Sequence, residues 1–593
     1  MDLITPKDLV SAVPFLKLIG GESLARQIFR LLKLDRINEE YSTRTHLPAK
    51  EFIEDVLRGI GCRYEFPEED LENIPREGSF ITTSNHAYGG LDGMILLKIL
   101  PSVRPDYKIL VNFLLTNILP IREYFVGVNP FETYQDVKSS IGGLKDAFSH
   151  LSDGHPLGIF PAGEVSTYQL KQRRITDKEW QHSILRFIKK ARVPVVPIYF
   201  DGHNSTLFHL LGMIHPMLRT ARLPAEMLNK KDKLIRMRIG PPIPVKEQEL
   251  FKDIAEYGKY LRMRTYNPFL AYQPKKKHFH LSLRTLEKVI DPPDPALIEK
   301  EIAQISETHS LFTLGEDQVF CVPSALIPNT IRELGRLREI TYRSVGEGTG
   351  KSMDIDDFDL VYEQLFIWNH REKRIIGGYR VAKGDQIIPK AGMKGLYISS
   401  LFRIDERFSP VLKVSIELGR SFIIKDYQKK VLSLFLLWKG ILYLLLKHPE
   451  YRYLIGPVSI PNSYTELSKS LAVEFLKTNY FNSEFAEFIA PRKEFEYTLD
   501  RSIDQEIFHK YTEQDIGRLD KFIQDFDPGY RTPILLKKYI SVNAEIIGFN
   551  VDPKFNYCLD ALMILDLFEV PFDTIESLSK ELNDQSILER FRK

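Results

Sequence analysis

The hydrophobic pattern in the first half of the chain alternates between short apolar runs and helical periodicity. Strand-like runs occupy residues 79–84, 157–160 and 195–200, and residues 177–191 have a helical pattern. Strands that alternate with helices are typical of an α/β sheet, in which functional side chains lie on loops at the strand ends. We therefore predict an α/β domain over residues 46–270.

The N-terminal segment, residues 1–45, contains one amphipathic pattern. Between residues 22 and 37, apolar side chains recur at helical spacing and basic side chains take other positions: Leu24, Ile28, Leu31 and Leu32, with Arg26, Arg30 and Lys33. A helix of this kind packs on its own domain or lies on an anionic membrane surface. Both interpretations remain open, and a lipid substrate would favour the second.

A linker and a second domain are predicted after this region. Prolines and a Lys-Lys-Lys-His run interrupt residues 271–305, which is typical of a solvated linker, although the lysines would also suit an acidic carrier protein or anionic lipid. A strand-like run at 319–322 then precedes a helical pattern at 329–343. We predict a second α/β domain over residues 306–593.

The most apolar run, residues 431–446, raises the question of a membrane span. It is shorter than the roughly 20 residues needed to cross the hydrocarbon core, and Lys439 lies at its centre. We predict a buried helix there. Any contact with a bilayer would then be peripheral.

Composition narrows the class of protein. Of the 593 residues 43% are hydrophobic and 27% charged, the net charge is only +2, and the three cysteines include no Cys-x-x-Cys pair. These values indicate two to four soluble domains, a reducing compartment and no cysteine-based metal site. They suggest no nucleic-acid partner, and the polar start of the chain is unlike a signal peptide. We expect a cytoplasmic protein without a metal.

One loop carries the elements of a catalytic dyad. The strand-like run at 81–84 leads into Asn85-His86, then Gly89-Gly90, and reaches Asp92 before the next apolar run. An imidazole can take the proton of an alcohol while a carboxylate fixes its tautomer. Alternatively, His86 is an ordinary loop residue and Asp92 caps the following helix.

A second motif about seventy residues later adds specificity. Residues 158–166 read Gly-Ile-Phe-Pro-Ala-Gly-Glu-Val-Ser, and residues 192–205 contain Val-Pro-Val-Val-Pro. Together these stretches resemble the glycerolipid acyltransferase family, with its Asn-His-x4-Asp and Phe-Pro-Glu-Gly-Thr-Arg-Ser motifs, over roughly residues 75–245. The resemblance implies that His86 and Asp92 are catalytic. It also implies that five residues bind substrate: Asn85, Phe160, Pro161, Gly163 and Glu164.

The chain departs from these motifs at two points. One extra residue separates His86 from Asp92, which Gly89-Gly90 can absorb because glycine adopts positive φ. Val165 replaces the arginine that the family associates with the acceptor phosphate, and valine offers no hydrogen-bond donors. The acceptor is therefore expected to be a hydroxyl group outside glycerophosphate. The variant pattern resembles the hemolysin-like subgroup that makes amino-acid-containing lipids.

The second half resembles another acyltransferase class. Four elements follow in order: Arg338 with Tyr342, Asp356 with Asp359, Gly378-Tyr-Arg380, and Glu417-Leu-Gly-Arg420. They resemble ornithine acyltransferase and acyl-homoserine-lactone synthase, relatives of the GNAT fold that use thioesters of acyl carrier protein. The resemblance implies that these residues bind substrate and that the donor is an acyl-carrier-protein or acyl-CoA thioester, with no permanently bound cofactor.

The chemistry of N-acylation suggests individual roles in this half. Glu417 is the predicted base, Arg420 and Arg380 would hold carboxylates or phosphopantetheine, and Asp356 and Asp359 would attract a cationic substrate. On a regular strand Glu417 and Arg420 would face opposite ways, unless a bulge at Gly419 resets the register. The alternative is that these charges form a structural ion-pair network.

These patterns together predict a bifunctional amino-acid lipid synthase, peripheral on the inner face of the cytoplasmic membrane. Its GNAT-like half would N-acylate an amino acid, expected to be ornithine, with a 3-hydroxyacyl group, and its N-terminal half would O-acylate the 3-hydroxyl. One alternative is a lysophospholipid acyltransferase whose second half only binds carrier protein. The other is a non-enzymatic peripheral membrane protein.

Overall fold

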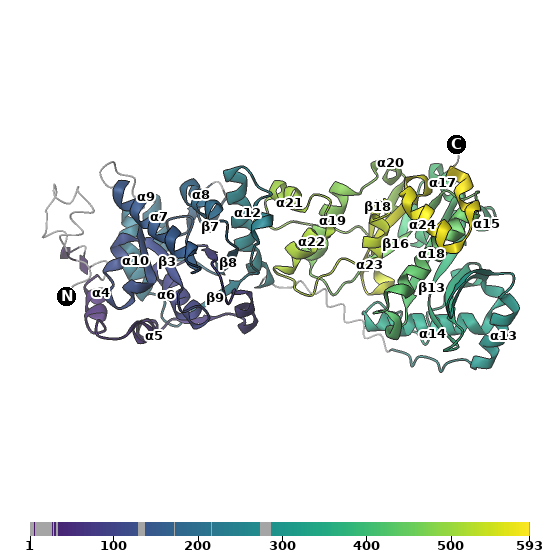
Figure 1. The fold of residues 1–593 in the computed structure, drawn as a ribbon, viewed down its shortest axis with the longest axis horizontal. Coiled ribbons are helices and arrows are strands. Elements are labelled where there is room, and N and C mark those ends of the chain that lie inside the picture. Colours follow the sequence, from purple (N-terminus) through teal and green to yellow (C-terminus); the bar gives the residue numbers. More distant parts are fainter. Residues whose placement is uncertain are drawn as a thin grey trace. The chain divides into compact units, whose positions relative to one another are not determined.

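The structure is a computed structural model that describes residues 34–128, 137–170, 172–214, 216–272 and 286–591, together with five isolated positions before residue 34 (Figure 1). The chain divides into two compact units. Unit 1 comprises Met1–Pro274 and Arg501–Tyr511, and unit 2 comprises Lys275–Asp500 and Thr512–Lys593. The apolar positions of the predicted N-terminal helix and the linker lysines lie outside the described residues.

Unit 1 is built on a seven-stranded sheet in the order β1-β9-β8-β2-β5-β3-β4. Its strands are β1 (Arg63–Glu65), β2 (Ile81–Ser84), β3 (Lys108–Asn112), β4 (Phe125–Val128), β5 (Leu157–Ile159), β8 (Val195–Phe200) and β9 (Leu234–Ile239). Apart from the β8–β9 pair, neighbouring strands are parallel. The carboxyl ends of β2, β3, β5 and β8 therefore meet at one edge of the sheet, where functional loops of open α/β sheets gather.

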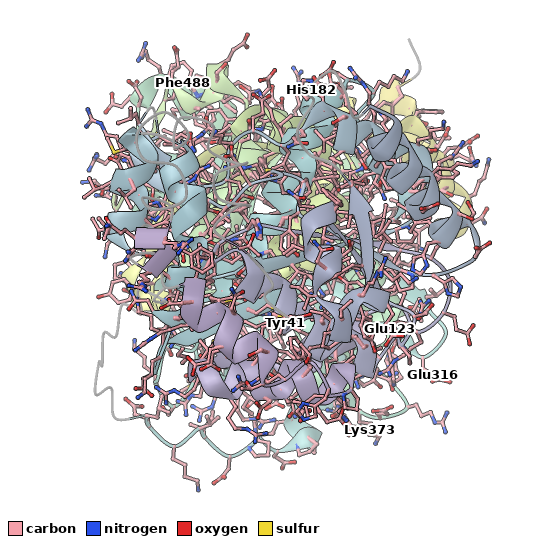
Figure 2. The ribbon with its side chains drawn as sticks, turned by 90° about the vertical axis from the view of Figure 1, so that its left-hand side faces the viewer. Tyr41, Glu123, His182, Glu316, Lys373 and Phe488 are labelled. Atoms are coloured by element: carbon pink, nitrogen blue, oxygen red, sulfur yellow. The ribbon has the colours of Figure 1, made fainter. Side chains whose placement is uncertain are left out.

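Helices pack around this sheet: α4 (Leu34–Ser42), α5 (Ala49–Ile60), α6 (Gly90–Ile99), α7 (Val137–Ser152), α8 (His182–Ala191), α9 (Thr206–Ile214), α10 (Pro216–Leu228), α11 (Val245–Gln248), α12 (Ile254–Tyr266) and most of α21 (Gln505–Thr512). A small hairpin of β6 (Thr167–Gln169) and β7 (Arg174–Thr176) follows β5. Figure 2 shows the side chains on this framework, with Tyr41 on the purple α4.

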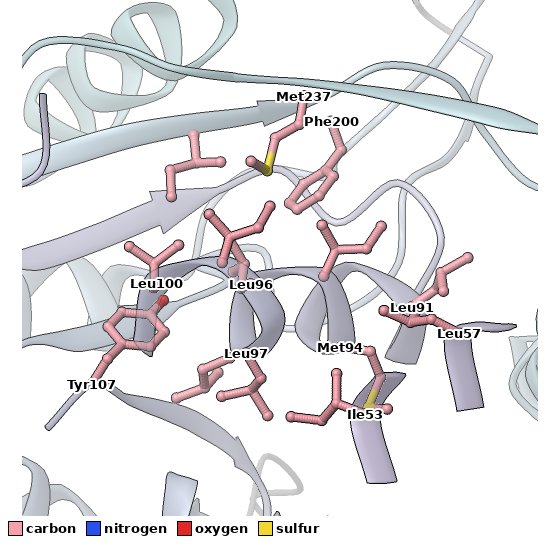
Figure 3. Packing of buried hydrophobic residues seen from close by; sticks show 14 of the residues in the cluster. Ile53, Leu57, Leu91, Met94, Leu96, Leu97, Leu100, Tyr107, Phe200 and Met237 are labelled. Atoms are coloured by element: carbon pink, nitrogen blue, oxygen red, sulfur yellow. The ribbon is translucent and has the colours of Figure 1, made fainter. Parts of the chain in front are cut away.

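Helix α6 lies at the centre of the unit 1 core (Figure 3). Its sequence, Gly-Leu-Asp-Gly-Met-Ile-Leu-Leu-Lys-Ile, is apolar around most of its circumference, as expected for a helix covered on two sides. Figure 3 shows Leu96 facing Phe200 and Met237 of the sheet, while Leu97 lies on the side of Ile53 in α5. This packing fixes the first turn of α6, which carries Asp92.

Unit 2 contains an eight-stranded sheet in the order β10-β11-β12-β13-β15-β16-β19-β18. Its strands are β10 (Ser310–Leu314), β11 (Asp317–Pro323), β12 (Glu363–Asn369), β13 (Arg374–Lys383), β15 (Ser415–Ile423), β16 (Tyr453–Ile460), β18 (Glu545–Asp552) and β19 (Cys558–Asp566). A separate two-stranded sheet joins β14 (Phe402–Ile404) to β17 (Ile489–Pro491). Within the large sheet only β15 and β16 are parallel among the described pairs.

The helices of unit 2 are α13 (Pro295–Ile305), α14 (Pro328–Ser344), α15 (Gly384–Ala391), α16 (Ile398–Leu401), α17 (Ser409–Lys413), α18 (Val431–Lys447), α19 (Glu466–Asn479), α20 (Ser483–Ala486), α22 (Ile516–Gln524), α23 (Ile534–Ile540) and α24 (Phe572–Leu582). The apolar run at 431–446 forms α18, most of which is buried, as predicted. Among the described residues, no helix combines the length and the apolar character that a membrane crossing requires.

The boundary between the units differs in one respect from the predicted domains. The chain changes unit after Pro274, a position within the predicted linker, but Arg501–Tyr511 returns to unit 1. There Tyr511 stacks near Tyr260 with ring centroids 5.3 Å apart and donates a hydrogen bond to Glu247. The sequence offers no local signal for this return, because the segment has the pattern of an ordinary amphipathic helix.

Candidate acyl-transfer sites

In unit 1, the loop after β2 brings His86 and Asp92 together. His86 Nδ1 lies 3.0 Å from Asp92 Oδ2, and Asp92 is fully buried while His86 remains partly exposed. The carboxylate therefore holds the proton of the imidazole on Nδ1 and leaves Nε2 as the atom that can take a proton. This is the geometry of a general-base dyad.

Asp92 also caps the helix that follows it, so both interpretations of this residue apply. Its Oδ2 accepts the backbone N–H groups of Tyr88 at 2.9 Å and Gly89 at 3.0 Å. Helix α6 starts at Gly90 with Gly89 as its N-cap, which places Asp92 at the third helical position. Gly89 has a φ of 89°, so glycine accommodates the extra residue between His86 and Asp92.

The loop after β5 forms one wall of this site. The ring centroids of Phe160 and His86 lie 4.3 Å apart, and the backbone N–H of Ser166 donates to the carbonyl of His86. Gly163 has a φ of 70°, and a Cβ there would come within 2.0 Å of Gln181 Nε2. The Pro161 carbonyl accepts the backbone N–H of Gln181. These contacts make Phe160 the side chain of this loop that directly contacts the dyad.

The charges beside the dyad are already neutralised. Glu164 pairs with Arg219 at 2.5 Å and with Lys178 at 2.6 Å. Val165 is buried and its methyl group faces Gly89. The described residues thus provide no unpaired cation at the position where the family motif has arginine, and Glu164 holds two cations instead of contacting the dyad.

Asn85 has a structural role in this arrangement. Its amide nitrogen donates to the carbonyl of Phe200 at 2.9 Å, and its oxygen accepts the N–H of Phe200 at 2.7 Å. Both polar atoms of the buried side chain are therefore committed to joining the ends of β2 and β8. This use of the amide does not favour the substrate contact that the sequence predicts for Asn85.

Sequence reasoning missed Asp177, which supports the backbone of the dyad. This buried carboxylate accepts hydrogen bonds from the backbone N–H of His86 at 3.2 Å and from the hydroxyl of Ser166. Burial raises its pKa from the ordinary range of aspartate, although both hydrogen bonds oppose that shift. No motif marks it, because it lies 91 residues from His86 in the chain.

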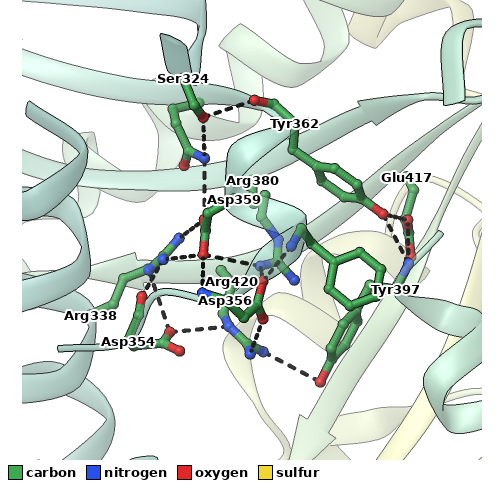
Figure 4. A network of polar contacts seen from close by, with 12 residues as sticks. Ser324, Arg338, Asp354, Asp356, Asp359, Tyr362, Arg380, Tyr397, Glu417 and Arg420 are labelled. Carbon is green, nitrogen blue, oxygen red and sulfur yellow. Dashed lines mark hydrogen bonds and ion pairs between the residues drawn. The ribbon is translucent and has the colours of Figure 1, made fainter. Parts of the chain in front are cut away.

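In unit 2, the predicted charged residues form one buried network (Figure 4). Arg338 makes two hydrogen bonds to Asp359, at 3.0 and 2.9 Å, and Arg380 contacts Asp359 and Asp356. Arg420 joins Asp356 at 3.1 Å and also Asp354 at 3.1 Å. Asp354 is a member that sequence reasoning missed.

The arginines and aspartates of this network are paired mainly with one another. Asp359 is fully buried, and the guanidinium groups of Arg338 and Arg380 hold its pKa at about 2 against the opposing effect of burial. Direct substrate contacts by Arg338, Arg380 and Asp359 are therefore not favoured by these partners. Asp356 keeps 27% exposure, the largest in the network, and remains the most accessible of the predicted acids.

Tyr342 and Arg420 lie at the border of this network. Tyr342 donates to the carbonyl of Ser421 at 2.9 Å, which anchors α14 to β15. The guanidinium of Arg420 lies 4.3 Å from the ring centroid of Phe555 and 5.0 Å from that of Tyr397. Cation–π contacts of this kind order an arginine that also carries two carboxylate partners.

The carboxylate of Glu417 is buried and surrounded by hydrogen-bond donors. It accepts hydrogen bonds from the hydroxyl of Tyr362 and from the backbone N–H groups of Tyr397 at 3.1 Å and Ile398 at 2.7 Å. Burial raises its pKa, although these bonds oppose the shift. A carboxylate with both oxygens engaged is poorly placed to take a proton from substrate, and the contacts favour an organising role. The base assignment remains a sequence prediction.

β15 contains a bulge, the condition under which Glu417 and Arg420 can face the same way. The register with β13 shifts between Arg380↔Gly419 and Gly378↔Phe422, so β15 has one extra residue. Arg420, next to Gly419, adopts the left-handed region with a φ of 52°. The bulge lets Glu417 and Arg420 both take part in the polar contacts of this site, which a regular strand would prevent.

Strands β15 and β16 separate beside this bulge. In the described chain they pair at three positions, ending at Glu417↔Ile455. Parallel strands that diverge leave backbone hydrogen-bonding groups available to an extended substrate. Ser459, in the diverging part of β16, donates to Asp560 of β19 at 2.7 Å.

Asp560 is a further candidate that no sequence motif indicates. Its Oδ1 accepts from Ser459 and Cys558, while Oδ2 has no hydrogen bond from a described residue. Burial, followed by the charge of Asp552, raises the pKa of Asp560 to about 7. A carboxyl group with this pKa exchanges protons near neutrality. Isolated acidic residues on a strand offer no sequence signal for such a role.

Comparisons with known proteins agree with the two folds. The model of the acyltransferase family matches residues 13–272, and the model of the GNAT acetyltransferase domain matches residues 337–439. The glycine N(alpha)-acyltransferase of Phocaeicola vulgatus is 31% identical over 288 residues, which cover 46% of this chain and 86% of the relative. This chain belongs to the acyltransferases. It is an enzyme that transfers acyl groups, so the non-enzymatic alternative is wrong.

Two further comparisons concern this acyltransferase. The lyso-glycine lipid O-acyltransferase of Bacteroides thetaiotaomicron is 28% identical over 240 residues, which cover 39% of this chain and 85% of the relative. The crystal structure of the 1-acyl-sn-glycerophosphate acyltransferase PlsC from Thermotoga maritima shares 17% identity and covers 40% of this chain and 88% of its own. The TM-score of this comparison is 0.24. This chain thus contains an acyltransferase domain followed by a GNAT domain.

Proposed function

We propose that the enzyme carries out both acylations of an amino-acid lipid. The GNAT domain attaches a 3-hydroxyacyl group to the amine of an amino acid, and the acyltransferase domain attaches a second acyl chain to the 3-hydroxyl. The observation that carries this proposal is the presence of both domains on one chain that is similar to an enzyme named for glycine N-acylation and to another named for lyso-glycine lipid O-acylation.

The O-acylation step follows from the dyad. His86 Nε2 takes the proton of the 3-hydroxyl as its oxygen attacks the thioester carbonyl, while Asp92 holds the opposite side of the imidazole. A tetrahedral intermediate forms, the carbon–sulfur bond breaks, and His86 returns the proton to the departing thiolate. The products are an ester and a free thiol.

The charges around the dyad support an acceptor without a phosphate group. Recognition of phosphate usually needs a bidentate or clustered cationic donor. Here Arg219 and Lys178 are paired with Glu164, and Val165 replaces the motif arginine. An acylated amino acid with a free hydroxyl needs no phosphate-binding cation at this position.

Substrates and location complete the proposal. The names of the relatives favour glycine as the amino acid, and the motif resemblance of the second half favours ornithine. We propose that the acyl donor is a thioester of acyl carrier protein, and acyl-CoA is the alternative donor to be compared with it. We also propose a peripheral location on the inner face of the cytoplasmic membrane. Incubating the purified chain with either amino acid and either 3-hydroxyacyl thioester measures both preferences.

A single variant separates the two reactions. With His86→Ala, O-acylation should fall by about 10²-fold or more, because a hydroxyl group is a poor nucleophile without a base. N-acylation by the GNAT domain should continue. Lipid extracts of expressing cells, measured by mass spectrometry, should then contain accumulated mono-acylated amino acid with a free 3-hydroxyl.

His203→Ala provides a matched control at the same edge of the sheet, because His203 is exposed and its Nδ1 bonds to the adjacent carbonyl of Asn204. It should leave both products unchanged. If neither wild type nor His86→Ala yields acylated amino acid and the variant loses only phospholipid remodelling, the enzyme is a lysophospholipid acyltransferase whose second half binds carrier protein.

A further inference from the structure

The exposed apolar side chains of unit 1 gather around the edge that carries His86. Most of its large exposed hydrophobic residues lie on segments that follow the carboxyl ends of β3, β5 and β8: Phe113, Leu115, Leu119, Tyr168, Leu170, Leu207, Leu210 and Met213. Because these strands are parallel to β2, the segments leave the sheet at the same edge as the His86 loop. Exposed apolar residues scattered singly need no explanation, but such a concentration does.

The hairpin and α9 form the densest part of this surface. Leu207, Leu210 and Met213 lie on α9 at spacings of three residues and are 47%, 52% and 56% exposed. They therefore share one face of a helix that contains no Asp, Glu, Lys or Arg. A hollow of about 220 Å³ separates this face from Tyr168 and Ile175 of the hairpin.

Both walls of the hollow are attached to the dyad loop. The residue before the hairpin, Ser166, donates its N–H to the carbonyl of His86. On the other side Asn204, just before α9, donates to the carbonyl of Tyr88. The apolar surface is thus continuous with the backbone that positions the catalytic dyad.

The hairpin turn adds positive charge next to the apolar residues. Leu170 is 69% exposed in this turn, and Arg173 has a φ of 50° there. Arg173 is exposed and forms no ion pair with any described residue. Arg174, by contrast, donates to Gln172 at 3.2 Å and lies with Trp180 and Tyr266 on the other face of the hairpin from Ile175. An exposed apolar tip beside an unneutralised arginine is the combination that favours binding to an anionic lipid surface.

We propose that α9 and the β6–β7 hairpin form the face that docks on an anionic phospholipid bilayer. Leu170, Leu207, Leu210 and Met213 would enter the interfacial region, while Arg173 contacts lipid phosphate. The hollow between the two walls would open towards the membrane. This inference deepens the proposed function, because a hydroxylated lipid acceptor would reach His86 directly from the bilayer.

Vesicle flotation of the full chain tests this surface without any assumption about the substrate. Vesicles of phosphatidylcholine are compared with vesicles that also contain phosphatidylglycerol. The double variant Leu210→Glu/Met213→Glu should bind at least about tenfold more weakly to the anionic vesicles. Arg173→Gln should weaken binding by about fivefold on anionic vesicles alone, and high salt should remove the difference.

Controls separate a local effect from unfolding or a change in net charge. Ile534→Glu introduces one glutamate, the same charge as Leu170→Glu, at a 68% exposed position in unit 2 and should bind vesicles as wild type does. Leu170→Glu, at the hairpin turn, provides a second apolar variant in case the double variant fails to fold. Matching melting temperatures verify that the compared proteins are folded.

Several results would overturn the inference. One is vesicle binding as strong as that of wild type in both apolar variants, and another is an equal loss of vesicle binding in Ile534→Glu. A third is a wild-type protein that does not bind vesicles and instead self-associates or binds acyl carrier protein through these residues. Failure of the proposed function would give a different result from failure of this inference. The wild-type protein would make no acylated amino acid, but its vesicle binding would still depend on α9 and the hairpin.

Discussion

Glu417 and Asp560 illustrate how two buried carboxyl groups in one domain differ in chemical availability. Three hydrogen-bond donors surround Glu417, two of them backbone N–H groups that cannot move without distorting the chain. Asp560 accepts both of its hydrogen bonds on one oxygen and lies beside the diverging strands. The second arrangement is better suited to proton transfer, since the acceptor atom is not already in use.

Substitution of these two carboxyl groups is predicted to have different effects on N-acylation. Asp560→Asn should lower kcat/KM for N-acylation by about 10²-fold, whereas Glu417→Gln should mainly lower the melting temperature, because an amide cannot accept hydrogen bonds from all three donors. The wild-type rate should rise as pH passes through about 7, because the raised pKa keeps Asp560 protonated and inactive below that value.

Initial rates of N-acylation, measured from roughly pH 5.5 to roughly pH 8.5, cover both sides of this pKa and reveal the dependence. Asp560→Asn should flatten the profile and leave the melting temperature nearly unchanged. A normal profile in Asp560→Asn, together with loss of N-acylation in a folded Glu417→Gln protein, would return the base assignment to Glu417.

At the scale of elements, glycines act together with the carboxylates of Asp92 and Asp177 in shaping the dyad loops. Gly89 and Gly163 both have positive φ, and each joins a strand end to the segment that follows. Gly163 in addition leaves room for the side-chain amide of Gln181, which donates to the carbonyl of Ala162. The orientation of Phe160 against His86 depends on this turn.

Gly163→Ala should therefore damage the site without removing any functional group. The left-handed conformation and the contact with Gln181 should together cost about 1–3 kcal/mol in unfolding free energy. O-acylation should fall while N-acylation persists. Thermal denaturation and the two product assays measure these effects.

Gly142→Ala is the matched control for this substitution. Gly142 lies in α7 with nothing within 4 Å of the added Cβ, so alanine should stabilise the helix by about 0.5–1 kcal/mol. If Gly163→Ala retains wild-type stability and O-acylation, the turn at Gly163 does not hold Phe160 against His86.

At the scale of the whole molecule, the chain is not simply two consecutive domains. Arg501–Tyr511 belongs to unit 1, where Tyr511 covers Tyr260, which in turn stacks on Phe251 at 4.4 Å. Tyr260 and Phe251 are fully buried. A cut in the linker alone would therefore remove a part of the first unit that the sequence assigned to the second.

The fragment 1–274 should consequently be less stable than the same fragment joined to residues 501–511 by a flexible linker. Removing Tyr511 exposes the ring of Tyr260 and removes one of the two tyrosine hydroxyl groups that donate to Glu247. The melting temperature should fall by roughly 2–4 °C for each kcal/mol lost. Differential scanning calorimetry of the two fragments measures the difference, and equal melting temperatures would show that the segment contributes nothing to unit 1.

The sequence alone determined the features that depend on neighbouring residues. The α/β character, the buried helix at 431–446 and the His86–Asp92 pairing all follow from periodicity, turn residues and spacing along a short stretch. Both acyltransferase domains could be recognised because each places several characteristic residues in a fixed order.

Tertiary structure decided which charged and apolar residues find partners. It enclosed Glu417, matched Arg338 and Arg380 with aspartates, and used Asn85 to join two strands. It also brought Asp177 to the backbone of His86 and returned Arg501–Tyr511 to unit 1. The physical reason is that burial and pairing depend on contacts between residues tens to hundreds of positions apart, on which local periodicity carries no information.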